Sequence, residues 1–206
     1  MINIDALLVQ TDKWVFCHIP KNGGANFKRE FRISRNIPIV KYDWEKQMIN
    51  HQLSSWWEKN YSIRNKQWIC ISRNPYSRYV SWFFFIRKRQ KESNTTHWSN
   101  VTFEDFVRNN MLENSQKHRK YKESNEWRTW NPSDPQSHWI TPNMKVFSLE
   151  TQLEEMEDYT KTKFAHKRYN STEHAPWPEY YTQEIADIVY DRYKIDFDTL
   201  HYSKDI

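Results

Sequence analysis

Short apolar runs alternate along the chain with longer stretches that repeat their apolar side chains every three or four residues. The runs at residues 13–19, 67–72 and 144–150 are short and rich in β-forming residues, which predicts three buried strands. Helical spacing predicts helices at 25–31, 43–60, 75–86, 102–107, 151–159 and 178–200. Buried strands that alternate with helices predict an α/β fold with a mostly parallel sheet.

Local signals refine this outline. Pro75 fits the first turn of a helix, and Thr102 can cap the next helix with Asp105 at its third position. Residues 90–100 are polar and predict a loop, and residues 113–137, basic in "KHRKYK", predict an exposed polar excursion. There is no internal repeat, and the length of 206 residues predicts a single domain over residues 1–206.

The composition narrows the function only a little. The net charge of +5 favours an anionic partner such as a phosphate ester, an acidic glycan or a nucleic acid, without deciding among them. The two cysteines, Cys17 and Cys70, lie in separate apolar runs and form no CxxC motif, so we expect reduced thiols and no metal. No apolar run is long enough to span a membrane and no signal peptide is evident, which predicts a soluble cytoplasmic protein with no membrane partner.

The only two glycines of the chain, Gly23 and Gly24, stand side by side in "HIPKNGGAN", after the first predicted strand and before a helix. Glycine allows a positive φ and a close approach of the backbone to a ligand. The N–H groups at a helix N-terminus attract anions, and Lys21 adds a positive charge. The loop therefore predicts a phosphate site, although a tight turn with a surface lysine fits it too. Lys21 precedes both glycines, which excludes the P-loop spacing.

A second loop, "SRNPYSRYVSW", follows the second predicted strand. Arg73 leaves the end of this strand, where its guanidinium can bind a phosphate through two hydrogen bonds. Ser81 lies eight residues later, about two turns into the predicted helix. Ligands of α/β folds bind at the carboxyl ends of strands, so both loops are candidate anion sites. The alternative for this loop alone is a surface arginine and an ordinary helical serine.

Together, "HIPKNGG" and "ISRNPYSRYVS" resemble the two cofactor motifs of the sulfotransferases that use 3′-phosphoadenosine 5′-phosphosulfate (PAPS). The chain is most similar to the carbohydrate-type members, whose usual motifs read H-I-P-K-T-G-G-T-S and V-R-N-P-x-x-R-x-V-S. The resemblance runs from about residue 13 to the C-terminus, but only these two motifs are specific. It implies a P-loop-like three-layer fold in which helices flank the sheet. It also implies an enzyme that transfers a sulfuryl group from PAPS to a hydroxyl group of a carbohydrate.

The resemblance also implies which residues bind the cofactor. The 5′-phosphosulfate side would be lined by Pro20, Lys21, Asn22, Gly23, Gly24, Ala25 and Asn26. The 3′-phosphate would be held by Arg73 and Ser81, and His174 lies in a region that closes over the cofactor in relatives. The chain departs from the family at Ala25 and Asn26, where Thr-Ser is usual. A hydroxyl donor is missing at Ala25, and the Asn26 amide is a possible replacement.

Sulfuryl transfer needs a base for the acceptor hydroxyl and a positive charge on the leaving phosphate. Lys21 suits the second role. Histidine has a suitable pKa for the first. We choose His51, because related sulfotransferases carry a base between the two motifs, with Glu45 and Glu58 as weaker alternatives. His18 is expected to shape the loop. The remaining histidines are His97, His118, His138, His166 and His201.

Three further interpretations stay open. The tryptophans at positions 56, 57, 127, 130 and 139 fit core packing better than a sugar-stacking platform. Gln136 and Trp139 fall where relatives often carry acceptor-side residues. The functional alternatives are a sulfotransferase fold that binds nucleotide without efficient transfer, a kinase-like phosphate-binding protein, and a nucleic-acid-binding module. The last has no recognisable motif.

Overall fold

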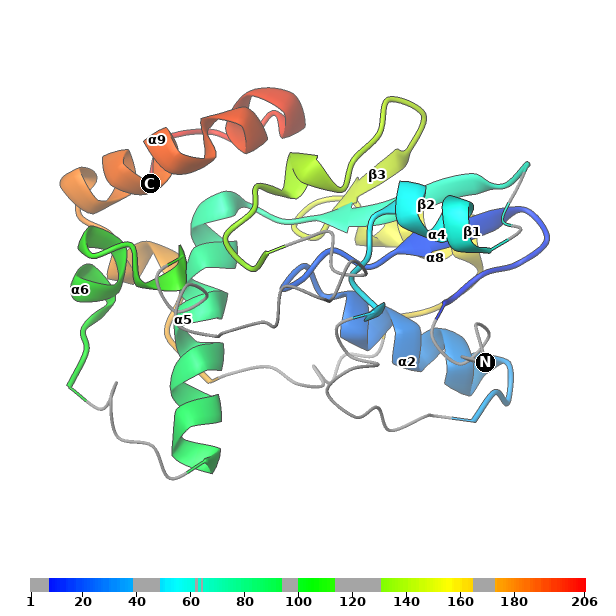
Figure 1. Ribbon diagram of the computed structural model, residues 1–206, viewed down its shortest axis with the longest axis horizontal. Helices are drawn as coiled ribbons and strands as arrows, with labels where there is room; N and C mark the ends of the chain where they lie inside the picture. Colours follow the sequence, from blue (N-terminus) through cyan, green and yellow to red (C-terminus); the bar gives the residue numbers. More distant parts are fainter. Residues whose placement is uncertain are drawn as a thin grey trace. The chain divides into compact units, whose positions relative to one another are not determined.

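The computed structural model describes residues 8–38, 49–61, 63, 65–93, 100–113, 131–164 and 173–206 (Figure 1). These residues fall into two compact units. The first takes in the described residues within 8–72 and 138–164, and the second those within 73–113, 131–137 and 173–206. The single-domain organisation over residues 1–206 stays a prediction.

The first unit contains a parallel sheet of three strands, β1 (Trp14–Cys17), β2 (Gln67–Ser72) and β3 (Lys145–Ser148), in the order β1-β2-β3 (Figure 1). All three are predicted from the sequence. The first and third are shorter than predicted, because the chain leaves the ladder at His18 and at Leu149. Cys17 stands opposite Cys70 in the register, and both are fully buried free thiols.

Side chains alternate between the two faces of this sheet, as the period of a strand requires. One face packs against α2 (Gly24–Ser34) and α8 (Leu153–Thr160), and this cluster includes Phe16, Ile69, Ile71, Phe147, Phe27, Phe31 and Met156. The other face packs against α4 (Ser54–Asn60), and its cluster includes Val15, Cys17, Trp68, Cys70, Trp57 and Trp139. Helices therefore cover both faces, and the α/β fold predicted from the sequence is confirmed.

Helix α4 covers only the end of the helix predicted at 43–60, and residues 39–48 lie outside the described residues. Trp57 and Trp139 are each 1% exposed, which confirms core packing for these two tryptophans. Trp127 and Trp130 lie outside the described residues.

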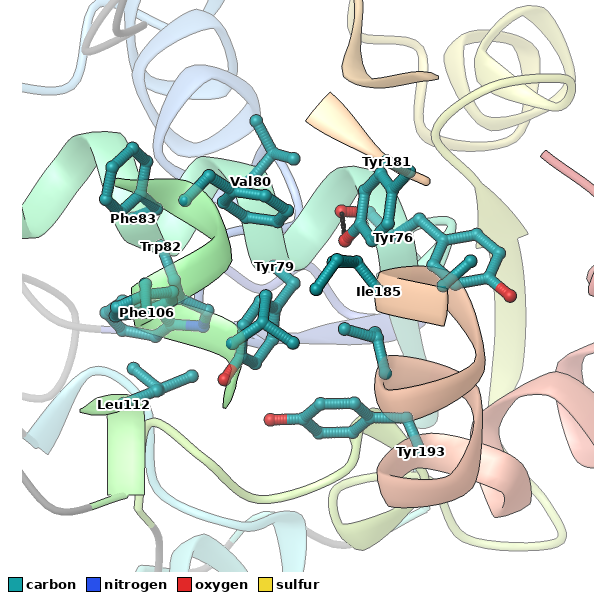
Figure 2. Packing of buried hydrophobic residues seen from close by; sticks show 14 of the residues in the cluster. Tyr76, Tyr79, Val80, Trp82, Phe83, Phe106, Leu112, Tyr181, Ile185 and Tyr193 are labelled. Atoms are coloured by element: carbon teal, nitrogen blue, oxygen red, sulfur yellow. Dashed lines mark hydrogen bonds between the residues drawn. The ribbon is translucent and has the colours of Figure 1, made fainter. Parts of the chain in front are cut away.

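The second unit consists of α5 (Pro75–Glu92), α6 (Phe103–Arg108), the 3-10 turn η2 (Trp177–Tyr180) and α9 (Gln183–Leu200). Figure 2 shows its aromatic core, in which the Tyr181 hydroxyl donates a hydrogen bond to the Tyr76 carbonyl. Both predicted helix starts are confirmed, because α5 begins at Pro75 and the Thr102–Asp105 capping box is formed. Helix α5 runs past residue 90, into the stretch predicted as a loop.

The predicted polar excursion is only partly described. Residues 114–130 lie outside the described residues, and the end of the stretch, 131–137, departs from the expected exposure. Gln136, in the 3-10 turn η1 (Gln136–His138), is fully buried, and its side-chain amide is satisfied by two hydrogen bonds to the Arg73 backbone. Where the structure describes helices, none is both long and apolar enough to cross a membrane.

Candidate active site

The loop after β1 carries two residues in the left-handed backbone region. The φ angle of Gly23 is 79° and that of Lys21 is 69°. Glycine adopts this conformation readily, whereas for a lysine it costs roughly 1–2 kcal/mol. Strained residues of this kind cluster at functional sites. The strained residue here is Lys21, which the sequence analysis assigns to stabilising the leaving phosphate.

Asn22 anchors this loop to the sheet. Its side chain is 1% exposed, and its Nδ2 donates a hydrogen bond of 2.8 Å to the carbonyl oxygen of Ile71 in β2. Pro20 beside it is buried as well. These contacts give Asn22 a structural role in holding the loop at the carboxyl end of β1, and its contact with a cofactor stays a prediction.

The two glycines are required for different reasons. Gly23 supplies the positive φ, and a Cβ there would also lie 2.9 Å from Cδ1 of Leu149. Gly24 is a helical residue, but a Cβ on it would lie 2.3 Å from Cδ2 of the His18 ring, a distance that real Cβ atoms do not show. The close approach expected at this glycine is therefore made by an imidazole of the chain itself.

The N-terminus of α2 provides polar groups for an anion. Gly23 is the N-cap and has no side chain to bond the first-turn N–H groups, and the first turn carries no acidic residue. The backbone N–H groups of Asn26 and Phe27 return to the Gly23 carbonyl, while Gly24 and Ala25 precede these bonds. Oδ1 of Asn26 is buried without a hydrogen-bond partner among the described residues, and Ala25 is exposed.

His51 is held against the strand end from which the loop starts. Its Nδ1 lies 2.8 Å from the carbonyl oxygen of His18. A carbonyl only accepts hydrogen bonds, so Nδ1 carries the proton and Nε2 of the neutral ring carries the lone pair. The Trp139 indole donates to the His51 carbonyl at 2.8 Å. The structure thus brings the predicted base and the predicted glycine loop together within the first unit.

His18 lies between these groups. Its ring centroid is 4.2 Å from that of His51, and its Nδ1 is buried without a partner among the described residues. Burial of the ring, together with electrostatic repulsion of its protonated form by the neighbouring titratable groups of His51 and Lys28, holds the pKa of His18 well below its usual range. The expectation that His18 shapes the loop agrees with its packing against Gly24.

In the second unit, Arg73 is held by its backbone and by its side chain. Its N–H donates to Oε1 of Gln136 at 2.8 Å, and Nε2 of Gln136 donates to its carbonyl at 2.7 Å. Its guanidinium Nε donates to Oγ of Ser77 at 2.9 Å. Ser81, one helical turn beyond Ser77 on α5, is 7% exposed. The Arg73 guanidinium therefore bonds to a serine that lies one helical turn before Ser81, the serine that the sequence pairs with it.

Two residues that hold this motif were missed from the sequence. Asp196 is fully buried in α9, and its carboxylate accepts hydrogen bonds of 2.8 Å from the backbone N–H groups of Gln136 and Ser137. Ser77 was also missed, although its spacing of four residues from Ser81 was a usable signal. Gln136, predicted on the acceptor side, serves here to fix the Arg73 backbone.

The other candidates have these surroundings. His174 is half-buried, its Nδ1 donates to the Ala175 carbonyl at 2.7 Å, and its ring stacks on Phe84 with centroids 4.9 Å apart. Glu58, a weaker candidate base, accepts a bond from the Trp68 indole at 2.5 Å. Glu45, His97, His118 and His166 lie outside the described residues. The described residues contain no cluster of ligands suited to a metal ion.

A family model described as "Sulfotransferase family" matches residues 5–203, nearly the whole chain. The chain belongs to the sulfotransferase family. No curated protein and no solved structure matches it. The mixed α/β structure with its parallel sheet is consistent with the sulfotransferase type of fold, and membership indicates a transferase that moves sulfuryl groups to an acceptor substrate.

Proposed function

We propose that this sulfotransferase transfers the sulfuryl group of PAPS to a hydroxyl of a carbohydrate, by in-line displacement with His51 as the base. PAPS, when bound, supplies the sulfuryl group and leaves as adenosine 3′,5′-bisphosphate. The observation that carries the proposal is the hydrogen bond of 2.8 Å between Nδ1 of His51 and the His18 carbonyl. This bond ties the predicted base to the end of the first strand, from which the chain continues through Ile19 into the Pro20–Lys21 turn.

The first unit fits the 5′-phosphosulfate. Its glycine loop leads into a helix N-terminus without a side-chain cap, and the first turn has no carboxylate to repel an anion. The Asn26 side chain supports the same assignment, because its Oδ1 is buried without a partner among the described residues and an amide can exchange its oxygen and NH₂ positions to donate to a phosphate. Lys21, Gly23, Gly24 and Ala25 would complete this set, with Pro20 and Asn22 as the buried supports of the loop.

The second unit carries the residues that we assign to the 3′-phosphate, Arg73 and Ser81. The Arg73 backbone is fixed by Gln136, and its Nε is directed to Ser77. A guanidinium held at one edge in this way is preorganised, so less conformational freedom is lost when it binds a phosphate. His174 is assigned to the same cofactor by family resemblance alone.

In the proposed reaction, Nε2 of His51 accepts the proton of the acceptor hydroxyl as the oxygen attacks sulfur. The hydrogen bond from Nδ1–H to the His18 carbonyl favours the tautomer in which Nε2 can accept this proton. The Lys21 ammonium stabilises the negative charge that develops on the leaving phosphate oxygen. A general base of this kind contributes on the order of 10²–10⁴ to the rate. The carbohydrate acceptor is supported by the resemblance of the motif pair to carbohydrate-type members.

Cofactor binding is tested with adenosine 3′,5′-bisphosphate in a thermal shift assay. We expect the nucleotide to raise the melting temperature, and we expect Lys21→Ala or Arg73→Ala to abolish the shift. Lys88→Ala and Arg87→Ala, on the exposed end of α5, are matched controls that should keep it. No shift at millimolar nucleotide, or an equal loss in the controls, would contradict the proposal. A shift with ATP and magnesium alone would favour the kinase-like alternative.

Catalysis is tested separately, with labelled PAPS and a mixture of hydroxyl acceptors. We expect transfer to a carbohydrate, and a loss of about 10²-fold or more in His51→Gln with the nucleotide-induced shift retained. The second candidate is a protein that binds nucleotide but transfers poorly. The specific observation in its favour is Ala25, which stands exposed at the helix N-terminus without a hydroxyl. Binding without transfer by the unchanged protein would establish this second candidate.

A further inference from the structure

A buried lysine lies behind the glycine loop and has no part in the proposed chemistry. Lys28 is on α2, one turn after Gly24, and is only 7% exposed. Lysine is almost never buried in this way unless it is paired. Its Nζ donates a hydrogen bond of 2.7 Å to Oδ1 of Asn50, which is also 7% exposed.

Asn50 directly precedes His51, so this bond links α2 to the segment that carries the predicted base. The same short segment is held at two more points. Nδ1 of His51 bonds to the His18 carbonyl, and the Trp139 indole bonds to the His51 carbonyl. The three contacts come from a helix, a strand end and the stretch before β3, all within the first unit.

We infer that Lys28 is a positioning residue, which fixes the orientation of His51 relative to the glycine loop by holding Asn50 from the loop's own helix. The inference rests on the proposed function, because it assigns Lys28 to the reaction for which His51 is the base. A substitution of Lys28 would then affect the rate of sulfuryl transfer only through Asn50 and the backbone of His51.

The chemistry of the amine supports this role. Burial, with the charge of Arg32 on the same helix, lowers the pKa of Lys28 to about 7. An amine donates to an amide oxygen both as NH₃⁺ and as NH₂, so the contact with Asn50 persists on either side of that pKa. An apolar side chain would fill the same space without the desolvation cost, but it would leave Oδ1 of Asn50 without this bond.

The inference is tested with a double-mutant cycle of Lys28→Met and Asn50→Ala. We expect each single variant to lower kcat, by a factor approaching about 100, because small misplacements of a catalytic group have effects of this order. The KM for PAPS should change little. The double variant should be no slower than the slower single one, since both remove the same contact. Arg32→Met is the control, because it removes a neighbouring buried cation of α2 and leaves the Lys28–Asn50 bond in place.

A second measurement does not depend on activity. The imidazole ¹⁵N shifts of His51 should report the Nδ1–H tautomer in the unchanged protein and in Arg32→Met. Lys28→Met and Asn50→Ala should show a mixture of tautomers. Losses of kcat that add as independent effects, or an unchanged kcat and tautomer in both variants, would overturn the inference.

Different results would contradict the proposed function and the positioning role of Lys28. If the unchanged protein neither binds adenosine 3′,5′-bisphosphate nor transfers a sulfuryl group, the proposed function is wrong, and the tautomer comparison alone decides whether Lys28 positions His51. If Lys28→Met does not fold, Asn50→Ala removes the same bond without emptying the position in α2, and its kcat and tautomer decide the outcome.

Discussion

The side-chain amide of Gln136 pairs with the backbone of Arg73 in both directions. Its oxygen accepts from the Arg73 N–H, and its nitrogen donates to the Arg73 carbonyl. This is the pattern that a residue of a neighbouring strand would make. Gln136 is itself fixed, because Asp196 accepts its backbone N–H. Helix α9 thereby determines where the main chain of Arg73 lies.

Gln136→Ala should therefore weaken nucleotide binding indirectly, through the position of Arg73. It leaves the Arg73 N–H and carbonyl without these partners, so we expect the free energy of unfolding to fall by about 1–3 kcal/mol. We also expect the affinity for adenosine 3′,5′-bisphosphate to fall about tenfold, measured by isothermal titration calorimetry. Gln183→Ala, an exposed glutamine of α9, is the control and should change neither quantity. An unchanged affinity at reduced stability would limit Gln136 to a role in the fold.

Gly24→Ala should destabilise the protein because the new Cβ collides with the His18 ring. Overpacking of this kind costs about 1–3 kcal/mol, measured by urea unfolding. The cost should be much smaller in a His18→Ala background, where the ring is absent, so the two changes should not be additive. Equal costs in the two backgrounds would show that His18 is not what requires glycine at this position.

The buried Lys28 should make stability depend on pH in a defined window. Its pKa is about 7 in the folded protein, against the ordinary lysine value of 10.5. Between these values the unfolded chain binds more protons, so stability rises with pH, by up to ~1.4 kcal/mol per unit. Below pH 7 both states are protonated and the cost of burying the charge is constant.

Lys28→Met removes this dependence. The difference in unfolding free energy between the unchanged protein and Lys28→Met, measured in urea at pH 7, 8, 9 and 10, should therefore grow in favour of the unchanged protein as the pH rises. Taking the difference cancels the other groups that titrate in this range. A difference that stays constant over the four pH values would show that Lys28 keeps an ordinary pKa in the folded protein.

Ala25→Thr should strengthen nucleotide binding. Ala25 is exposed in the first turn of α2, and a hydroxyl there would add a donor to a phosphate. A hydrogen bond to a charged group is worth about 1.5–3 kcal/mol, which corresponds to roughly tenfold or more in the affinity for adenosine 3′,5′-bisphosphate. Ala25→Val has the same shape without the hydroxyl and should bind as the unchanged protein does. Equal affinities of the two variants would place the phosphate away from this position.

Local patterns in the sequence were sufficient for much of the fold. The six residues of β2, the start of α5 at Pro75 and the capping box of α6 follow from short-range rules of burial and capping, and all were predicted. The glycine loop and Arg73 were also found as candidates, because the chemistry of each is contained in a few consecutive residues.

The residues that hold the glycine loop, His51 and Arg73 in place could not be predicted from local sequence patterns. Lys28 contacts Asn50 across 22 residues, and Gln136 contacts Arg73 across 63. Such pairs depend on how the chain folds back, and no periodicity or spacing encodes them. For the same reason the packing of His18 against Gly24 was not predicted, since the two residues come together only when the loop is closed.

Because the His18 ring packs directly against Gly24, the residue at one of these positions limits which residues the other can accept. A homologue with a small side chain in place of His18 would have room for a Cβ at the second glycine, so the two positions are expected to covary. A search for distant members that demands both glycines would then overlook chains with the same loop geometry, whereas one that treats the pair jointly would retain them.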